Sequence, residues 1–222
     1  MEKKKILCII PAYNAGKYIR QTLRAIKSQH YKNINIVVVD DASNDDTAAK
    51  ALTENVKVYS LKKNVGTYQA VNYALRRLKS FDYFYIHGAD DISYRNHFRE
   101  LANAIAMPNK LMAYCRYRRM EYTTGKDFGV LKGTRSSMVL WKKAVLDKIG
   151  LYDNTRFGGD TEFWDRFLLY YTSKNMAFVD KPLANCMMHG KNLTQVIGIE
   201  KRQAYVAEYR DRHSRLNGMH VL

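Results

Sequence analysis

The first half of the chain alternates between short apolar runs and segments with helical spacing, and this alternation restricts the possible folds more than any other feature. The run at 34–41, INIVVVDD, is continuous and β-branched, which is typical of a strand buried on both faces. Repeated strand–helix units with right-handed crossovers predict an α/β fold, with a Rossmann-like, mainly parallel central sheet and helices on both faces. Strands are predicted at 5–13, 34–41, 56–61 and 83–91, and helices at 16–29, 42–52, 66–80 and 94–107.

The second half follows a looser pattern. No linker, repeat or low-complexity tract interrupts it, so we predict a single domain. The predicted elements are a strand at 111–124, a strand and helix within 132–150, a Gly-rich loop and helix at 155–171, a strand at 176–190 and a basic, Tyr-rich helix at 198–217.

The chain is strongly basic. Its 37 Lys and Arg residues exceed its 21 Asp and Glu residues, which gives a formal net charge of +16. Generic solubility accounts for part of this charge, but the excess favours a polyanionic partner such as nucleic acid, an anionic membrane surface or phosphorylated substrates.

The cysteines and the apolar runs bear on the compartment. Cys8, Cys115 and Cys186 are odd in number and far apart, which is typical of reduced thiols and fits a cytoplasmic protein, or the host cytoplasm for a viral one. The first apolar run holds only about six residues, and no run approaches the roughly 18 that a membrane helix needs. We therefore expect no signal peptide and no transmembrane segment, while peripheral membrane contact stays open.

Polar residues follow three of the predicted strands, at Pro11–Asn14, Asp40–Asp41 and Asp90–Asp91. Because parallel sheets bind ligands at the carboxyl ends of their strands, these residues are expected to share one site. A carboxylate at 40 or 41 could accept the imide N–H of uracil or thymine, or ribose hydroxyls. The alternative is a helix start that Ser43 or Asn44 caps.

The adjacent carboxylates of Asp90 and Asp91 require compensation, because neighbouring like charges repel. Mg²⁺ or Mn²⁺ would provide it while holding substrate phosphates, since the chain has no Gly-rich phosphate loop. The alternative is a turn in which His87 or Arg95 pairs with the acids.

The segment RFGGDTEFWDR places Asp160 and Glu162 after a flexible Gly pair at a helix start, where a carboxylate could act as a general base. The alternative is that Asp160 caps the helix. Arg166 could pair with Asp160 or with a phosphate. His189, in CMMHGKN, looks exposed; a lone histidine is more often structural, and only proximity to Asp91 would make it a metal ligand.

Together these segments closely resemble family 2 glycosyltransferases of the GT-A fold. IIPAYNAGKYIRQTLRAIKSQHYKNINIVVVDDASNDDT is similar to the N-terminal half of that family, NVGTYQAVNYAL to its next element, and HGADD to its Asp-x-Asp element. GGDTEFWDR and MMHG are similar to its late acidic and His elements. The similarity covers roughly residues 5–190 in the same order.

The resemblance implies an inverting, metal-dependent transfer of a sugar from a nucleoside diphosphate sugar, of the UDP type, to an acceptor hydroxyl. Asp160 would be the catalytic base, Asp91 would ligate Mn²⁺ or Mg²⁺, Asp90 would lie near the donor sugar, and His189 would complete the metal shell. The nucleotide-sugar site would further include Pro11, Tyr13, Asn14, Asp40, Asp41, Asn64, Gly66 and Arg166. The domain would then comprise a nucleotide-binding half (1–107), an acceptor and catalytic half (108–197) and a basic C-terminal helix (198–222).

Three positions depart from the family pattern. Gly88 stands where many members have the first Asp of Asp-x-Asp, and Gly159 where a Glu is usual. Val71 stands where an Arg is frequent, so a phosphate-facing cation is missing; Arg135, Lys132 or Arg166 could substitute.

Family membership leaves the acceptor open. Basic residues interleave with aromatic ones, which favours DNA carrying a hydroxymethylated base, flipped out to reach the catalytic base. The alternatives are a cell-surface polysaccharide or lipid-linked oligosaccharide, a non-catalytic nucleotide-binding module, and a nucleotidyltransferase, whose Gly-rich basic loop is absent. The basic residues concerned are Arg116, Arg118, Arg119, Lys201, Arg202, Arg210, Arg212 and Arg215.

Overall fold

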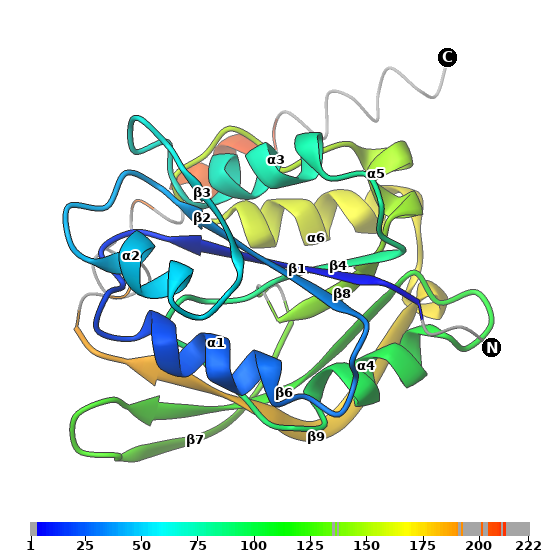
Figure 1. Cartoon of the computed structure of the whole chain (residues 1–222). Coiled ribbons are helices and arrows are strands. Elements are labelled where there is room, and N and C mark those ends of the chain that lie inside the picture. Colours follow the sequence, from blue (N-terminus) through cyan, green and yellow to red (C-terminus); the bar gives the residue numbers. More distant parts are fainter. Residues whose placement is uncertain are drawn as a thin grey trace.

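The computed structural model describes residues 4–134, 136, 138–190, 192, 201, 204–209 and 211. One sheet runs through this part of the chain, and helices cover both of its faces (Figure 1). The helices are α1 (Ile19–Lys27), α2 (Thr47–Leu52), α3 (Thr67–Arg77), α4 (His97–Ile105), α5 (Ala144–Ile149) and α6 (Gly159–Tyr170). The strands are β1 (Ile6–Ala12), β2 (Ile34–Asp40), β3 (Lys57–Ser60), β4 (Tyr83–Ile86), β5 (Ile92–Ser93), β6 (Met112–Glu121), β7 (Asp127–Lys132), β8 (Val139–Lys142) and β9 (Met176–Met188).

The strands follow the order β3-β2-β1-β4-β8-β6-β9-β5, and β7 pairs with β6. The first four strands of this order pair in parallel, which confirms the α/β prediction for the N-terminal half. On the other side, β4–β8, β8–β6, β6–β7 and β5–β9 are antiparallel, while β6 and β9 are parallel. The looser sequence pattern of the second half therefore corresponds to a mixed sheet.

Alternating side chains of the central strands bury into two cores. On β2, Val38 packs into the core under α1 and α4, whereas Val37 and Val39 pack into the core under α3, α5 and α6. Figure 1 shows these two sets of helices on opposite sides of the sheet. Burial on both faces explains the uninterrupted β-branched run at 34–41.

Two details differ from the prediction. The hairpin strand β7 was not expected, because its residues are largely exposed on both faces and carry no alternation of apolar and polar side chains. Helix α2 begins at Thr47 after Asp46, and neither Ser43 nor Asn44 caps it. Both instead bond to Asn14, which is a long-range contact that no capping pattern reveals.

The sheet continues from residues 1–107 into residues 108–197, so the proposed division of the chain stays a prediction. Most of the basic C-terminal segment at 198–222 lies outside the described residues, although 204–209 are helical. The three cysteines are free thiols, as predicted, with Cys8 and Cys115 buried and Cys186 partly so. Among the helices that the structure describes, none has both the length and the apolar character to cross a bilayer.

Candidate functional site

Three strand ends meet at one edge of the sheet. β1 lies between β2 and β4, with Ala12 opposite Asp40 and Ile9 opposite Ile86. The Asp41 amide donates to the Ala12 carbonyl at 2.8 Å, which extends this pairing beyond the strand. The polar segments at 11–14, 40–41 and 90–91 therefore share one edge, as the parallel topology predicts.

The loop after β1 is tied to the loop after β2 by Asn14. Its amide donates to Ser43 Oγ, its Oδ1 accepts from the Asn44 amide, and both distances are 2.9 Å. Asn14 thus stabilises the two loops at this edge of the sheet. Its predicted contact with the nucleotide sugar stays a prediction. Tyr13 beside it is 50% exposed, so its ring is accessible to a ligand, and Pro11 is partly buried.

The buried carboxylate of Asp41 shapes the loop at 64–66. Its Oδ1 accepts from the Val65 amide at 2.7 Å and its Oδ2 from the Gly66 amide at 2.8 Å. Asn64 Nδ2 donates to the Asp41 carbonyl, and Gly66 has a φ of 88°, in the region that favours glycine. The residues predicted to line the nucleotide pocket therefore form one hydrogen-bonded unit.

The neighbouring Asp40 is buried as well, and its Oδ1 has no hydrogen-bond partner among the described residues. A buried carboxylate oxygen without a partner costs about 1–3 kcal/mol. An N–H or O–H group of a ligand would remove this cost.

Arg156 is a candidate site residue that sequence reasoning missed. Its Nη1 donates to Asn64 Oδ1 at 2.6 Å and its Nη2 to the Asn64 carbonyl at 3.2 Å. Its Cγ lies 3.6 Å from the position that a Cβ on Gly66 would take. A cation from the segment before α6 thus reaches the loop at 64–66. The sequence could not reveal this contact, because Arg156 stands two residues before the Gly pair and its partner Asn64 lies 92 residues earlier.

Asp90 and Asp91 lie in the turn after β4, beside β9. Asp91 is buried, and its Oδ1 accepts from the Met187 amide at 3.1 Å. Burial and the adjacent charge of Asp90 raise the pKa of Asp91 to about 8. The ionised pair is therefore unfavourable in these surroundings, and a bound cation would stabilise it.

The alternative role of His87 as partner of these acids is wrong. Its ring nitrogens lie 2.7 Å from the Gly88 carbonyl and 2.7 Å from Ser93 Oγ. Burial lowers the pKa of His87 to about 4, so the ring is neutral near neutral pH. A neutral imidazole that bonds elsewhere does not compensate the carboxylates.

Gly88 leaves a space between the two acids. A Cβ at this position would lie 2.5 Å from Asp91 Oδ2 and 3.0 Å from Asp90 Oδ1. A residue with a side chain here would require the two carboxylates to shift. Two carboxylate oxygens around one open point fit Mg²⁺ or Mn²⁺, which take one or two protein carboxylates together with substrate phosphates.

The predicted place of His189 in the metal shell stays a prediction, and the structure places its ring beside Asp90. Its Nε2 lies 2.8 Å from Asp90 Oδ2, its ring stacks on Tyr18 at 4.4 Å, and its side chain is only 10% exposed. Asn192 Nδ2 donates to the same oxygen at 2.8 Å. Among the described residues, no three His, Cys, Asp or Glu side chains gather as a metal cluster. His189 and Asn192 therefore hold Oδ2 of Asp90 in place.

Asp160 lies in the first turn of α6. Gly158, in a left-handed conformation, is the N-cap, so the alternative role of Asp160 as the cap is wrong. Its Oδ1 accepts from the Tyr68 hydroxyl at 3.1 Å and from the Thr161 amide at 2.9 Å. A Cβ on Gly159 would lie 2.7 Å from the Tyr68 ring, so this ring excludes the Glu that is usual in the family.

The predicted role of Arg166 at the nucleotide sugar stays a prediction, and the structure gives its guanidinium other partners. Its Nε and Nη2 bond to the buried Glu162 at 2.7 and 2.9 Å, and the guanidinium also donates to the carbonyls of Ile149 and Leu151. These bonds occupy the guanidinium on the inner side of α6. Lys132, a second suggested substitute, lies 4.6 Å from the centre of the Phe178 ring, and Arg135 lies outside the described residues.

We expect Arg166→Leu to lower the free energy of unfolding by about 3–5 kcal/mol, because it leaves the Glu162 carboxylate buried without its partner. Urea unfolding measures this loss. Arg116→Leu, which breaks the exposed pair with Asp180, is the matched control and should cost about 0–1 kcal/mol. Unchanged stability with weakened nucleotide-sugar binding would instead restore Arg166 to the ligand site.

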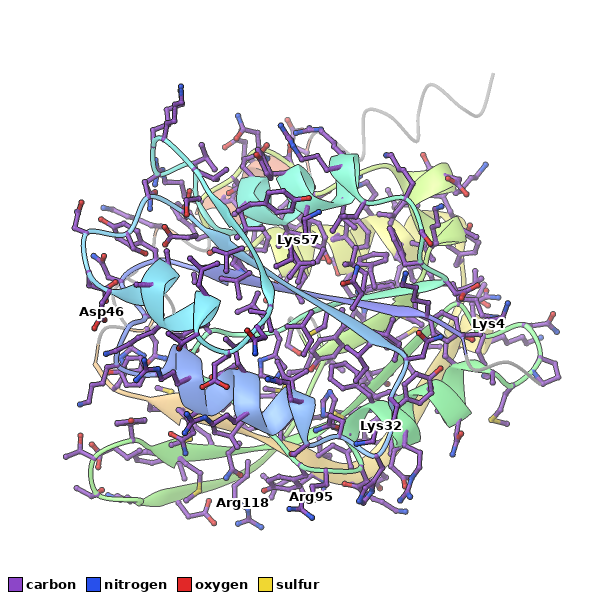
Figure 2. All side chains as sticks on the ribbon, viewed as in Figure 1. Lys4, Lys32, Asp46, Lys57, Arg95 and Arg118 are labelled. Atoms are coloured by element: carbon purple, nitrogen blue, oxygen red, sulfur yellow. The ribbon has the colours of Figure 1, made fainter. Side chains whose placement is uncertain are left out.

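Part of the basic surface is neutralised within the fold. On β6, Arg116 pairs with Asp180 and Arg118 with Asp127. Arg119 is partly buried, and its Nε has no partner among the described residues. In Figure 2 the labelled cations are spread from the right-hand edge (Lys4) to the lower edge (Arg118). These labelled cations therefore do not form a single stripe.

Two tyrosines of the C-terminal segment bond to acidic side chains elsewhere in the fold. Tyr205 donates to Asp153 Oδ2 at 3.2 Å, and the buried Tyr209 donates to Asp165 Oδ2 at 2.6 Å. Packing of Tyr209 on α6 keeps that ring from stacking on bases. Lys201 is exposed, while Arg202, Arg210, Arg212 and Arg215 lie outside the described residues.

Comparisons with known proteins agree with this architecture. The sequence profile described as Glycosyl transferase family 2 matches residues 7–169. An uncharacterized glycosyltransferase of Rickettsia typhi is 30% identical over 183 residues, which are 72% of this chain and 57% of that protein. The chain therefore spans little more than half the length of this relative.

Two solved structures share the fold. S. aureus TarS 1–349 in complex with UDP-GlcNAc superposes with a TM-score of 0.74 at 20% identity, over 88% of this chain and 62% of that one. The mannosyltransferase PcManGT of Pyrobaculum calidifontis, with GDP-Man and Mn²⁺, has a TM-score of 0.65 at 18% identity, over 87% and 59%. At these identities the likeness concerns the fold.

Proposed function

The chain belongs to glycosyl transferase family 2, and from this membership we propose that it transfers a sugar from a nucleoside diphosphate sugar to an acceptor hydroxyl. One observation carries the proposal. The strand-end carboxylates of β2 and β4 share an edge of the sheet, and the segment before α6 reaches the same loop at 64–66 through Arg156. These contacts support a proposal in which the nucleotide, the cation and the base would act at this edge of the sheet.

The donor in this proposal is a UDP-sugar. The nucleobase would contact Pro11, Tyr13 and the β2 carboxylates, where the unpartnered Asp40 Oδ1 is suited to accept an N–H or ribose O–H. Arg156 offers the cation that Val71 does not provide. The binding of UDP-GlcNAc to TarS, a protein of the same fold, supports the choice of nucleotide.

Asp91 and Asp90 would hold Mn²⁺ or Mg²⁺, with His189 and Asn192 orienting Asp90. When bound, the metal would neutralise charge on the departing nucleoside diphosphate. The Mn²⁺ in PcManGT supports this choice of ion.

Asp160 would take the proton from the acceptor hydroxyl as the sugar is displaced. One base that activates the acceptor hydroxyl suits direct displacement by that hydroxyl, which inverts the anomeric carbon. The activity is thus an inverting one in this proposal.

A thermal-shift experiment tests the donor. UDP-GlcNAc, UDP-glucose and GDP-mannose are each added with Mn²⁺, and a UDP-sugar is expected to raise Tm because it binds only the native state. Asp41→Asn should abolish the shift, because it weakens the loop at 64–66 as well as the nucleobase contact. Absence of any shift with Mn²⁺ or Mg²⁺ would contradict the donor assignment.

For the acceptor we propose a polyanion, and the sequence favours DNA with hydroxymethylated bases over a surface glycan or lipid-linked acceptor. The ion pairs of Arg116 and Arg118 reduce the basic surface available to DNA, which gives the glycan alternative added weight. A salt titration of DNA binding separates them, followed by turnover of the donor on hydroxymethylated DNA. DNA binding that is weak even at low salt would leave the glycan alternative.

A further inference from the structure

Tyr68 contacts the proposed base directly. It lies in the first turn of α3, and its hydroxyl donates to Asp160 Oδ1 at 3.1 Å across 92 residues of sequence. The side chain is buried, and burial together with the nearby Asp160 charge raises the pKa of Tyr68 well above its ordinary value. The phenol therefore stays protonated and remains a hydrogen-bond donor throughout the working pH range.

Three features of the structure fix the position of the Tyr68 ring. The missing side chain of Gly159 makes room for it, since a Cβ there would lie 2.7–2.9 Å from three ring atoms. The ring stacks on Tyr152 with centroids 5.7 Å apart and planes inclined by 20°. Asp41 bonds the two amides before α3, which fixes the helix start two residues from Tyr68. The hydroxyl is thus a fixed donor and not a mobile one.

We propose that Tyr68 is a positioning residue for Asp160, which locks its Oδ1 so that Oδ2 takes the proton of the acceptor hydroxyl. Oδ1 accepts both the Tyr68 hydroxyl and the Thr161 amide, and two bonds to one oxygen fix the rotation of the carboxylate. A fixed carboxylate loses less freedom in the transition state than a rotating one. This inference rests on the proposed role of Asp160 as the base.

Four other ionisable groups near this pair are either neutral or bonded to a partner. Glu162 is neutralised by its ion pair with Arg166, and Tyr205 donates to Asp153. The pKa of Tyr152 is raised by burial and by the charge of Asp160, so this phenol is also neutral. Arg156 is bonded to Asn64. Tyr68 is therefore a neutral donor whose hydrogen bond, like that of the Thr161 amide, favours the charged form of Asp160.

Tyr68→Phe tests the proposal, because it keeps the ring and removes only the hydroxyl. We expect kcat to fall by roughly 10- to 100-fold with the donor KM unchanged. A hydrogen bond donated to a carboxylate favours its charged form, so its loss should move the acid limb of the pH profile of kcat/KM to higher pH. A role confined to packing would move neither the limb nor kcat, because the ring stays in place.

Tyr209→Phe is the matched control, since it removes a tyrosine hydroxyl that donates to another carboxylate of α6, Asp165, and leaves the Tyr68–Asp160 bond intact; it should leave kcat and the pH profile unchanged. Asp160→Asn distinguishes a failure of the proposed base from a failure of the positioning role. An active Asp160→Asn variant would overturn the proposed base. An inactive Asp160→Asn variant beside a Tyr68→Phe variant with wild-type kcat and pH profile would overturn only the positioning role.

Discussion

Asp160→Asn is expected to lower kcat by about 10²- to 10⁴-fold, the range that a positioned general base supplies. The amide keeps the shape of the side chain and can still accept the bonds from Tyr68 and Thr161. It cannot take a proton from the acceptor. Initial rates of sugar transfer measure the loss, and the thermal shift with the donor should persist because Asp160 is not expected to bind the nucleotide.

Asp165→Asn is the matched control for this variant. Asp165 lies five residues further along α6 and accepts from the Tyr209 hydroxyl, so its substitution tests general damage to the helix. Its kcat should stay within about twofold of wild type, as for surface changes away from the chemistry. Equal losses in both variants would assign the effect to the fold and not to the base.

Asp91→Asn is expected to have opposite effects on activity and on stability. Activity should fall by about 10³-fold, since the variant loses a charged ligand for the divalent ion that stabilises the leaving group. The stabilisation of the wild type by Mn²⁺ with UDP should also disappear. Asparagine keeps an oxygen to accept from the Met187 amide, so the turn itself should survive.

The metal-free variant should be more stable than the wild type above acidic pH. The pKa of Asp91 is raised in the folded state to about 8, from an ordinary value of 3.8. The folded state then binds a proton that the unfolded state has released, so stability falls as pH rises through this window. The Asp91→Asn substitution removes this dependence, and urea unfolding across the window without metal measures it.

Asp82→Asn is a control that should change stability in the opposite direction. The pKa of Asp82 is lowered, despite partial burial, by hydrogen bonds from the Lys5 amide and from Lys4. Its carboxylate therefore stabilises the fold at neutral pH, and its loss should lower stability. If Asp91→Asn also lowered stability without metal, this result would contradict the claim that the ionised Asp90–Asp91 pair destabilises the fold.

Some contacts of the candidate site could be predicted from the sequence, and others depend on how the helices pack. The pairs at 40–41 and 90–91 could be placed together because each follows a strand-like run, and parallel strands end at one edge. Arg166 could not be assigned, because its partner Glu162 and the two carbonyls become neighbours only when α5 and α6 pack. The contact of His189 with Asp90 could not be predicted for the same reason, since the path of β9 decides which oxygen the ring reaches.

The sequence by itself determined the order of strands and helices in the first half, the two-sided burial of β2 and the edge at which the carboxylates meet. These follow from hydrophobic periodicity, which is local, and from the direction of parallel strands. Only the tertiary structure decided that Tyr68 bonds to Asp160, that Arg156 reaches Asn64 and that Gly88 and Gly159 make room for their neighbours. Such contacts join side chains far apart in the sequence, and the packing of whole helices against the sheet sets their distances.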